Sequence, residues 1–167
     1  MRLDELGPKI YDLIDTMVSS QTDIPTVPIV EDYDNAPRPE EPIYLSYIPS
    51  PLMRMVGKQV QYPETDTTPV QTIVEWEVPV TVREIGGYGQ YLQIIQTAQY
   101  QQSVRSYLYN ACMSIMRINQ IVPTPRLLDD DRWERESSME MILAITHVTS
   151  DDTTYIETVD INNNIGE

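Results

Sequence analysis

The longest regular alternation of apolar and polar side chains lies in residues 131–150. Its odd positions are apolar from Met139 to Ile145, whereas its even positions begin polar and turn apolar from Ile142. A period of two with one polar face is typical of a half-buried strand, and apolar residues on both faces are typical of a strand covered on both sides. We therefore expect one long strand that starts at a rim and ends in a core. A helix is the alternative, because Glu and Met favour helices, but the first half lacks apolar residues at helical spacing.

A second long alternation occupies residues 70–85, with valines, Thr72 and Trp76 on one face and mostly polar residues on the other. Pro79 cannot donate a hydrogen bond to a neighbouring strand, so it indicates a bulge or a sheet edge. Shorter strands are expected at residues 26–30, 43–48, 113–122 and 155–161. Pro28 places the first of these at an edge.

Apolar residues at helical spacing predict a helix over residues 3–18 and two short helices within residues 91–98 and 104–111. Residues 49–69 form a long excursion between strands, which we interpret as a hairpin arm or lid. The order of elements predicts an α+β fold, an antiparallel or mixed sheet with long strands and helices packed on one face. We expect a single domain over residues 1–167, with a flexible tail at 162–167.

The amino-acid composition argues against several classes of function. The formal net charge is −15, from 11 basic and 26 acidic side chains, which argues against a surface that grips nucleic acid by neutralising phosphates. No apolar run reaches the length of a membrane span, so no membrane contact is expected. The single cysteine, Cys112, excludes an internal disulfide.

Motifs that carry chemistry are missing from the sequence. His147 has no partner at a suggestive spacing, and Cys112 follows a helix end, where we expect a small buried residue. The glycines of residues 86–89 lack the lysine of a phosphate-binding loop and fit a strand-to-helix turn. The acidic run 129–131 has oxygen ligands for a hard cation, but consecutive loop carboxylates are more commonly solvated. We therefore predict no enzyme activity, no cofactor and no metal site.

Without such motifs, a structural role is the most direct interpretation. The two long strands and the arm are longer than a small monomeric domain requires. Exposed strand edges must be paired or blunted, and pairing them with neighbouring copies produces a ring. The alternative is a small acidic binding or inhibitor module in the cytosol, which accounts for the charge but not for the long strands.

Three segments resemble the phage neck and tail-terminator proteins. The first is VPIVEDYDNAPRPEEPIYLSYI, a short strand, an Asx-rich turn, an Arg-Pro pair and a Tyr-containing strand. The second is TVREIGGYGQYLQIIQTAQYQQSVRSYLYNACMSIMRINQI, a strand–GG–helix–helix–strand block in which family members usually show a glycine near the position of Cys112. The third is RLLDDDRWERESSMEMILAITHV, in which an aspartate-rich turn precedes Arg-Trp-Glu and a long strand.

The resemblance implies a virion structural protein at the head–tail junction of a tailed bacteriophage, assembled in the host cytoplasm. Such proteins cap the tail tube as rings of about six subunits, join it to the neck or connector proteins and, in contractile tails, meet the tail sheath. DNA would pass through the ring without specific binding. A neighbouring neck adaptor, or a neck protein that contacts the sheath, is the closest alternative.

Two groups of residues are expected to serve this role. Because Trp and Arg are favoured interface anchors, we predict that one group lies at a subunit or partner interface, although Trp133 has the alternative of plugging the end of its own core. The interface candidates are Arg38, Pro39, Trp76, Arg132, Trp133 and Arg135. Acidic walls repel the DNA backbone, so a second group is expected at the lumen or rim of the ring; the alternative is that these acids simply solvate its outside. These acids are Glu31, Asp32, Asp34, Asp129, Asp130 and Asp131.

Overall fold

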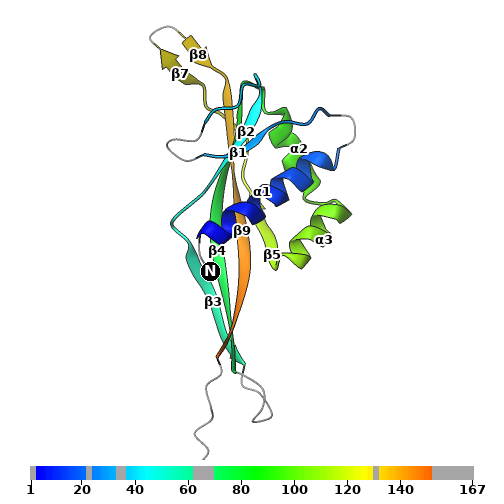
Figure 1. The fold of residues 1–167 in the computed structure, drawn as a ribbon, viewed down its shortest axis with the longest axis vertical. Coiled ribbons are helices and arrows are strands. Elements are labelled where there is room, and N and C mark those ends of the chain that lie inside the picture. The colour runs from blue at the N-terminus through cyan, green and yellow to red at the C-terminus, as the bar shows by residue number, and fades with distance from the viewer. Residues whose placement is uncertain (1–2, 22–23, 33–36, 62–69, 130–131, 152–167) are drawn as a thin grey trace, which may run out of the picture.

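Two strands of 16 residues each form the spine of the molecule. In the computed structural model, which describes residues 3–21, 24–32, 37–61, 70–129 and 132–151, β4 (Val70–Ile85) and β9 (Glu136–Asp151) pair antiparallel over their whole length (Figure 1). The register runs from Val70 opposite Asp151 to Ile85 opposite Glu136. The alternation of residues 70–85 therefore predicted β4 with its correct bounds.

Shorter strands extend this spine into a mixed sheet of seven strands within the described residues. Its main order is β1-β2-β4-β9-β5, in which β1 and β2 are parallel and all other pairs are antiparallel. The remaining strands of this sheet are β1 (Ile29–Glu31), β2 (Tyr44–Pro49), β3 (Arg54–Gln61), β5 (Met113–Ile118) and β6 (Val122–Pro123). Strand β1 lies at an edge, as Pro28 predicted.

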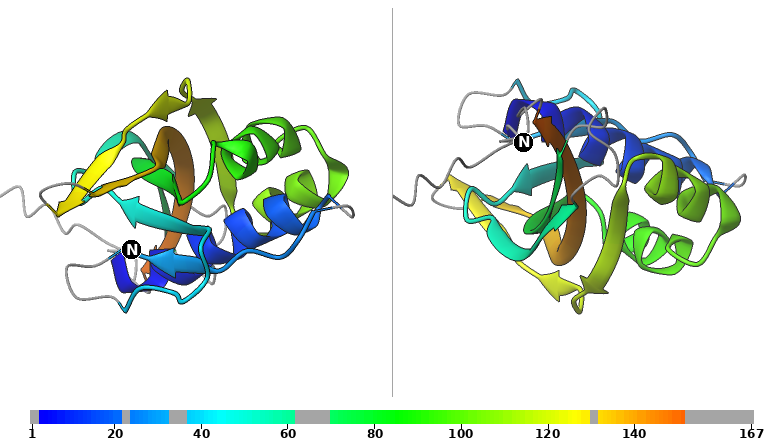
Figure 2. Two further views of the ribbon diagram at one scale, coloured as in Figure 1. Left: turned by 90° about the horizontal axis from the view of Figure 1, so that it is seen from above. Right: turned by 90° about the horizontal axis from the view of Figure 1, so that it is seen from below.

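Three helices of the described chain cover one face of the sheet, so the predicted α+β class with helices on one face is confirmed. They are α1 (Leu3–Ser19), α2 (Gln90–Ala98) and α3 (Gln102–Asn110), and Figure 2 shows them together on one side. The core between helices and sheet is aliphatic. Its fully buried members are Leu6, Ile10, Leu13, Ile14, Met17, Leu45, Val78, Val80, Val82, Leu92, Ile95, Ala98, Val104, Met141 and Leu143.

Tyrosine hydroxyls connect the layers where the core meets solvent. Each of three phenols packs its ring against apolar neighbours and donates its hydroxyl to a backbone carbonyl of a distant segment. The pairs are Tyr47–Gly7 at 3.0 Å, Tyr91–Pro25 at 3.1 Å and Tyr107–Lys9 at 2.8 Å. These bonds fix α1, and the loop that follows it, against β2, α2 and α3.

The turn from β4 into α2 is organised by one buried carboxylate. Glu84 is 1% exposed and lies on the same face of β4 as Val82, beneath the helices. Its Oε1 accepts the backbone N–H groups of Gly89 and Gln90 at 2.8 and 3.2 Å, and its Oε2 accepts those of Tyr91 and Leu92 at 2.8 and 3.3 Å. The first turn of a helix leaves such N–H groups without partners and carries a positive dipole end. The Glu84 carboxylate accepts hydrogen bonds from these N–H groups, and its negative charge lies at the positive end of the helix dipole.

Two glycines are needed to bring this carboxylate into place. Gly86 has φ +80°, and a Cβ there would lie 1.8 Å from the carbonyl oxygen of Pro42. A Cβ on Gly87 would lie 1.9 Å from Oε1 of Glu84. The strand-to-helix turn expected at residues 86–89 is therefore confirmed, and its glycines make room for backbone and for the carboxylate.

One end of the sheet forms a three-stranded ribbon whose outer part no helix covers (Figure 1). Strand β3 pairs with residues 71–77 of β4, whose other edge pairs with residues 144–150 of β9; we call residues 54–61, 71–77 and 144–150 the arm ribbon. The hairpin arm expected within residues 49–69 is thus present over β3, whereas residues 62–69 lie outside the described part. The predicted strand 155–161 and tail 162–167 lie outside it as well.

The prediction of one strand over residues 131–150, ending in a core, was wrong at both ends. Strand β9 begins at Glu136, because β4 ends at Ile85, and the Gly86 N–H bonds the carbonyl of Arg135 instead. The segment before it forms a separate hairpin of β7 (Arg126–Asp129) and β8 (Arg132–Glu134), at the opposite end of the molecule from the arm ribbon (Figure 1). The buried part of β9 is its middle, and Thr146, Val148 and Thr149 are exposed. The strand expected at 113–122 likewise ends at Ile118.

Cys112 is exposed, which corrects the expectation of a small buried residue. It directly follows the C-cap of α3, Ala111, and adopts φ +54°, the left-handed conformation that commonly ends a helix. Its carbonyl accepts the N–H of Thr146 at 3.0 Å, so the turn is locked to β9. Glycine adopts this conformation without the Cβ clash, so a glycine at this position would carry less strain.

We predict that Glu84→Gln lowers the free energy of unfolding by about 3 kcal/mol, because the amide presents N–H groups to N–H donors and removes a buried charge-assisted network. Denaturant unfolding measures this loss. Glu75→Gln is the matched control, since Glu75 is exposed on the same strand, and it should change stability by less than about 0.5 kcal/mol. Equal stability of both variants would contradict the role of Glu84.

We also predict that Cys112→Gly raises the free energy of unfolding by about 1 kcal/mol, because it removes the Cβ from a left-handed residue. Cys112→Ala keeps the Cβ and should leave stability unchanged. Thermal melts of both variants under reducing conditions separate backbone strain from any effect of the thiol. A glycine variant that melts below the alanine variant would refute the strain argument.

Candidate functional site

The described residues contain no constellation typical of catalysis. His147 is half-buried in the arm ribbon, and Cys112 is exposed at the end of α3. No group of three His, Cys, Asp or Glu side chains in the described ranges lies close enough to hold a metal ion. None of the helices in those ranges is long and apolar enough to cross a membrane.

The β7–β8 hairpin presents an aromatic side chain to solvent. Trp133 is 66% exposed, and its cross-strand partner Leu127 is also exposed. The alternative that Trp133 plugs the end of its own core is therefore wrong. Because Trp is costly to expose and enriched at binding hot spots, this hairpin is a candidate contact surface.

The base of the hairpin joins two other segments through arginines. Arg38 approaches Glu134 with 3.7 Å between Nη1 and Oε2. Arg135 stacks on the ring of Tyr88, with its Cζ 4.2 Å from the centroid, and hydrogen-bonds the Tyr88 hydroxyl. Exposed ion pairs and cation–π contacts are each weak. Together, the Arg38–Glu134 ion pair and the Arg135–Tyr88 contact place the loop before β2 and the turn before α2 beside the hairpin.

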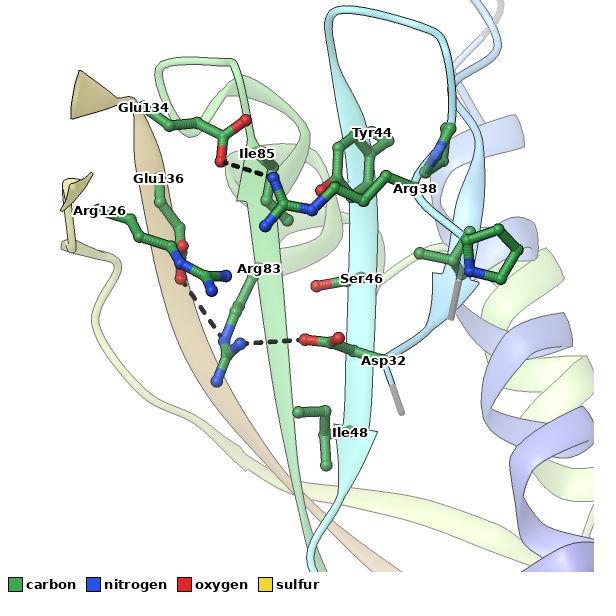
Figure 3. A pocket seen from close by; sticks show the side chains of 13 residues that line it. Asp32, Arg38, Tyr44, Ser46, Ile48, Arg83, Ile85, Arg126, Glu134 and Glu136 are labelled. Atoms are coloured by element: carbon green, nitrogen blue, oxygen red, sulfur yellow. Dashed lines mark hydrogen bonds and ion pairs between the residues drawn. The ribbon is translucent and has the colours of Figure 1, made fainter. Parts of the chain in front are cut away.

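A polar pocket of about 380 Å³ lies between this base and the sheet face opposite the helices (Figure 3). Alternate residues of β2 and β4 point into it, because successive side chains of a strand face opposite sides. Arg83 crosses its floor, with Nη1 3.0 Å from Oδ2 of Asp32 and Nε 3.6 Å from Oε1 of Glu136. Arg38 and Arg126 complete a set of three guanidinium groups around it.

Two buried side chains line the pocket beside these charges. Ser46 is 2% exposed, and its hydroxyl has no hydrogen-bond partner among the described residues. Figure 3 shows this hydroxyl pointing into the space between Arg38 and Arg83. Burial raises the pKa of the Tyr44 phenol above its usual range, and Arg38 partly opposes the rise. The Tyr44 hydroxyl therefore stays neutral at physiological pH.

The predicted interface residues separate into two places. Arg38, Pro39, Trp133 and Arg135 lie around the hairpin base, together with the backbone of Arg132. Trp76 lies apart, partly buried and packed on the hydrophobic core. About 30 Å of extended strand separates Trp76 from Ile85, the partner of Glu136.

The candidate acids that the structure describes are engaged within the chain. Glu31 accepts a hydrogen bond from the Tyr47 hydroxyl at 3.4 Å, and Asp32 pairs with Arg83. Asp129 contributes backbone to β7. Asp34, Asp130 and Asp131 lie outside the described residues.

Sequence reasoning missed Arg83, Glu136 and Ser46, the residues that build the pocket floor. Each is a polar residue on a predicted strand, and the alternation assigned Arg83 to a solvated face. A signal was available: Arg83 and Ser46 occupy alternating positions on strands that a mixed sheet can pair. Their register, Ser46 opposite Arg83 opposite Ser138, is a tertiary property.

Two comparisons with known proteins found a match. Among solved structures, the chain is similar to the PVC sheath/tube terminator of an extracellular contractile injection system in the extended state, with 13% identity and a TM-score of 0.33. That similarity covers 96% of this chain, which spans 65% of the length of that terminator. No curated protein matches the chain.

A family model described as phage neck terminator protein matches residues 9–167. The matched span includes both long strands, the three helices except the start of α1, the pocket and the hairpin. The chain therefore belongs to the family of phage neck terminator proteins.

Proposed function

We propose that this protein is a structural, non-enzymatic component of the virion that forms a ring at the head–tail junction. The ring caps the tail tube and joins it to the neck or connector proteins, and it leaves a channel for DNA. The observation that carries the proposal is the match of the neck terminator family over residues 9–167. Family membership supports a tail-terminating role, and a homohexamer is the arrangement that we propose for it.

Exposed apolar side chains at both ends of the molecule support contacts with neighbours. At one end are Leu127 and Trp133 of the β7–β8 hairpin. At the other, β3 of the arm ribbon exposes Met55, Val56 and Val60. Small soluble proteins rarely expose such residues in groups, and protein interfaces commonly bury them. We assign the hairpin with Arg38, Pro39 and Arg135 to one contact surface and the arm ribbon with Trp76 to a second.

A channel that lets DNA slide must avoid binding its phosphates. The net charge of −15 supports an acidic lining, because unpaired carboxylates repel the backbone. Glu31 and Asp32 have partners inside the subunit, so the proposal depends on the other acids. Among described residues near the hairpin base, Glu40 and Glu41 are exposed. Asp34 and Asp129–Asp131 stay proposed members of the lumen or rim.

Experiment distinguishes this role from two others. A neighbouring neck adaptor or a neck protein that contacts the sheath would share the ring but bind different partners. A small acidic binding module would remain a monomer and bind a basic partner. The mass of the complex and the identity of the bound partner separate all three.

We predict that the purified protein forms rings of about six copies, alone or when mixed with tail tubes, because closed cyclic symmetry pairs every contact surface. Native mass spectrometry measures the stoichiometry, and negative-stain images show whether tube ends are capped. Tubes without the protein are the control. A protein that stays monomeric and leaves tube ends bare would exclude the terminator role.

We predict that Trp133→Ala abolishes ring assembly or tube capping while shifting the melting temperature by no more than about 2 °C, because the side chain is exposed in the subunit. Trp76→Ala should instead lower the free energy of unfolding by about 2 kcal/mol, because Trp76 packs on the core. Tyr109→Ala, which removes an exposed aromatic residue of α3, is a control for general surface effects. Normal assembly of the Trp133 variant would remove the hairpin from the interface.

A further inference from the structure

The polar pocket has more hydrogen-bond donors than its own acids use. Arg83 occupies two of the three carboxylates, Asp32 and Glu136. The third, Glu134, is 3.7 Å from Arg38, a distance at which the charges attract but no hydrogen bond forms. The Arg38 guanidinium, with five N–H donors, therefore has no hydrogen-bond acceptor among the described residues.

Two further donors face the pocket without partners. Arg126 forms no ion pair with any acid that the structure describes, although it lies in the pocket wall (Figure 3). Ser46 is buried, and its hydroxyl lacks a partner in the same part of the chain. A buried hydroxyl without a hydrogen-bond partner destabilises a folded protein. A ligand that accepts this hydrogen bond removes the destabilisation, which favours its binding.

The chemistry of these donors selects a planar monoanion. Guanidinium groups bind a carboxylate through two parallel hydrogen bonds, and Ser46 supplies a third donor. A phosphate dianion is less suitable, because Asp32, Glu134 and Glu136 repel the additional charge.

The size of the pocket selects a carboxylate attached to a chain. About 380 Å³ is roughly thirteen times the volume of one water molecule in the liquid, so a free carboxylate of acetate size would leave most of it unfilled. Apolar groups of Ile48, Pro37 and Pro39 line the remaining wall and suit methylene groups. From this geometry we infer that the pocket binds a glutamate or aspartate side chain presented by a protein segment, a docking function that does not depend on the proposed ring.

Two capped tripeptides test the inference, glycine–glutamate–glycine and glycine–glutamine–glycine, with inorganic phosphate as a third probe. NMR titration of the whole protein should shift the amide signals around Ser46 and Arg83 with the glutamate peptide. The glutamine peptide and phosphate should bind more weakly. No shift at these residues with the glutamate peptide, or equal binding of the glutamine peptide, would overturn the proposal, as would tighter binding of phosphate.

Variants locate the site. Arg126→Gln should weaken binding of the glutamate peptide about tenfold, the effect of one charge-assisted hydrogen bond, while Arg117→Gln on β5 should leave it unchanged. Ser46→Ala should also weaken binding but leave the free protein equally or more stable, because it removes an unsatisfied buried hydroxyl. Ser114→Ala is its exposed control. Full binding by both pocket variants would place the carboxylate elsewhere and overturn the proposal.

Sedimentation identifies which protein supplies the carboxylate. Loss of self-association in Arg126→Gln, with assembly retained in Arg117→Gln, means that the segment comes from a second copy of this chain. Unchanged self-association together with weakened peptide binding means that it comes from a different protein. Both results are consistent with the pocket as a carboxylate site.

Discussion

The contact between the Glu84 carboxylate and the first turn of α2 joins the two layers of this protein. Four backbone N–H groups, from Gly89 to Leu92, donate to its two oxygens. The end of strand β4 therefore sets the position and direction of α2. The next residue back in the chain, Arg83, points to the opposite face and holds Asp32 and Glu136. Two consecutive residues thus anchor the helix layer and the pocket floor, and disturbance of this end of β4 reaches both.

The periodic parts of the fold were predictable because they depend on local pattern. The alternation over β4 and the helical spacing of α1 identified both elements, and the glycines marked the turn between β4 and α2. Glu84 was overlooked, although a glutamate on the apolar face of a strand, directly before Gly86 and Gly87, is an available sign of a buried helix cap. The break before β9 was not predictable in the same way. It occurs because β4 ends and β8 pairs with β7, and both are properties of the register.

The candidate site shows the same division. Arg38, Trp133 and Arg135 meet around one hairpin base, as expected of residues that serve one surface, but Trp76 lies far along β4. Composition could mark Trp and Arg as candidates for an interface, because their side chains are intrinsically suited to one. It could not show that Ser46 faces Arg83, because that contact joins segments 37 residues apart in sequence through strand pairing.

The arm ribbon has a mechanical consequence. Beyond Trp76 and Ile145, which pack in the core, its strands continue about five residues, roughly 17 Å at about 3.3 Å per residue. Because no helix covers this outer part, bending beyond Trp76 and Ile145 breaks no contact of the core, and a tilt of about 10° over that length moves the tip by about 3 Å. The molecule is thus rigid where Glu84 and the core hold it, and its arm ribbon can bend at the other end. Such a protein can follow a small change in the height or pitch of whatever it touches without repacking its interior.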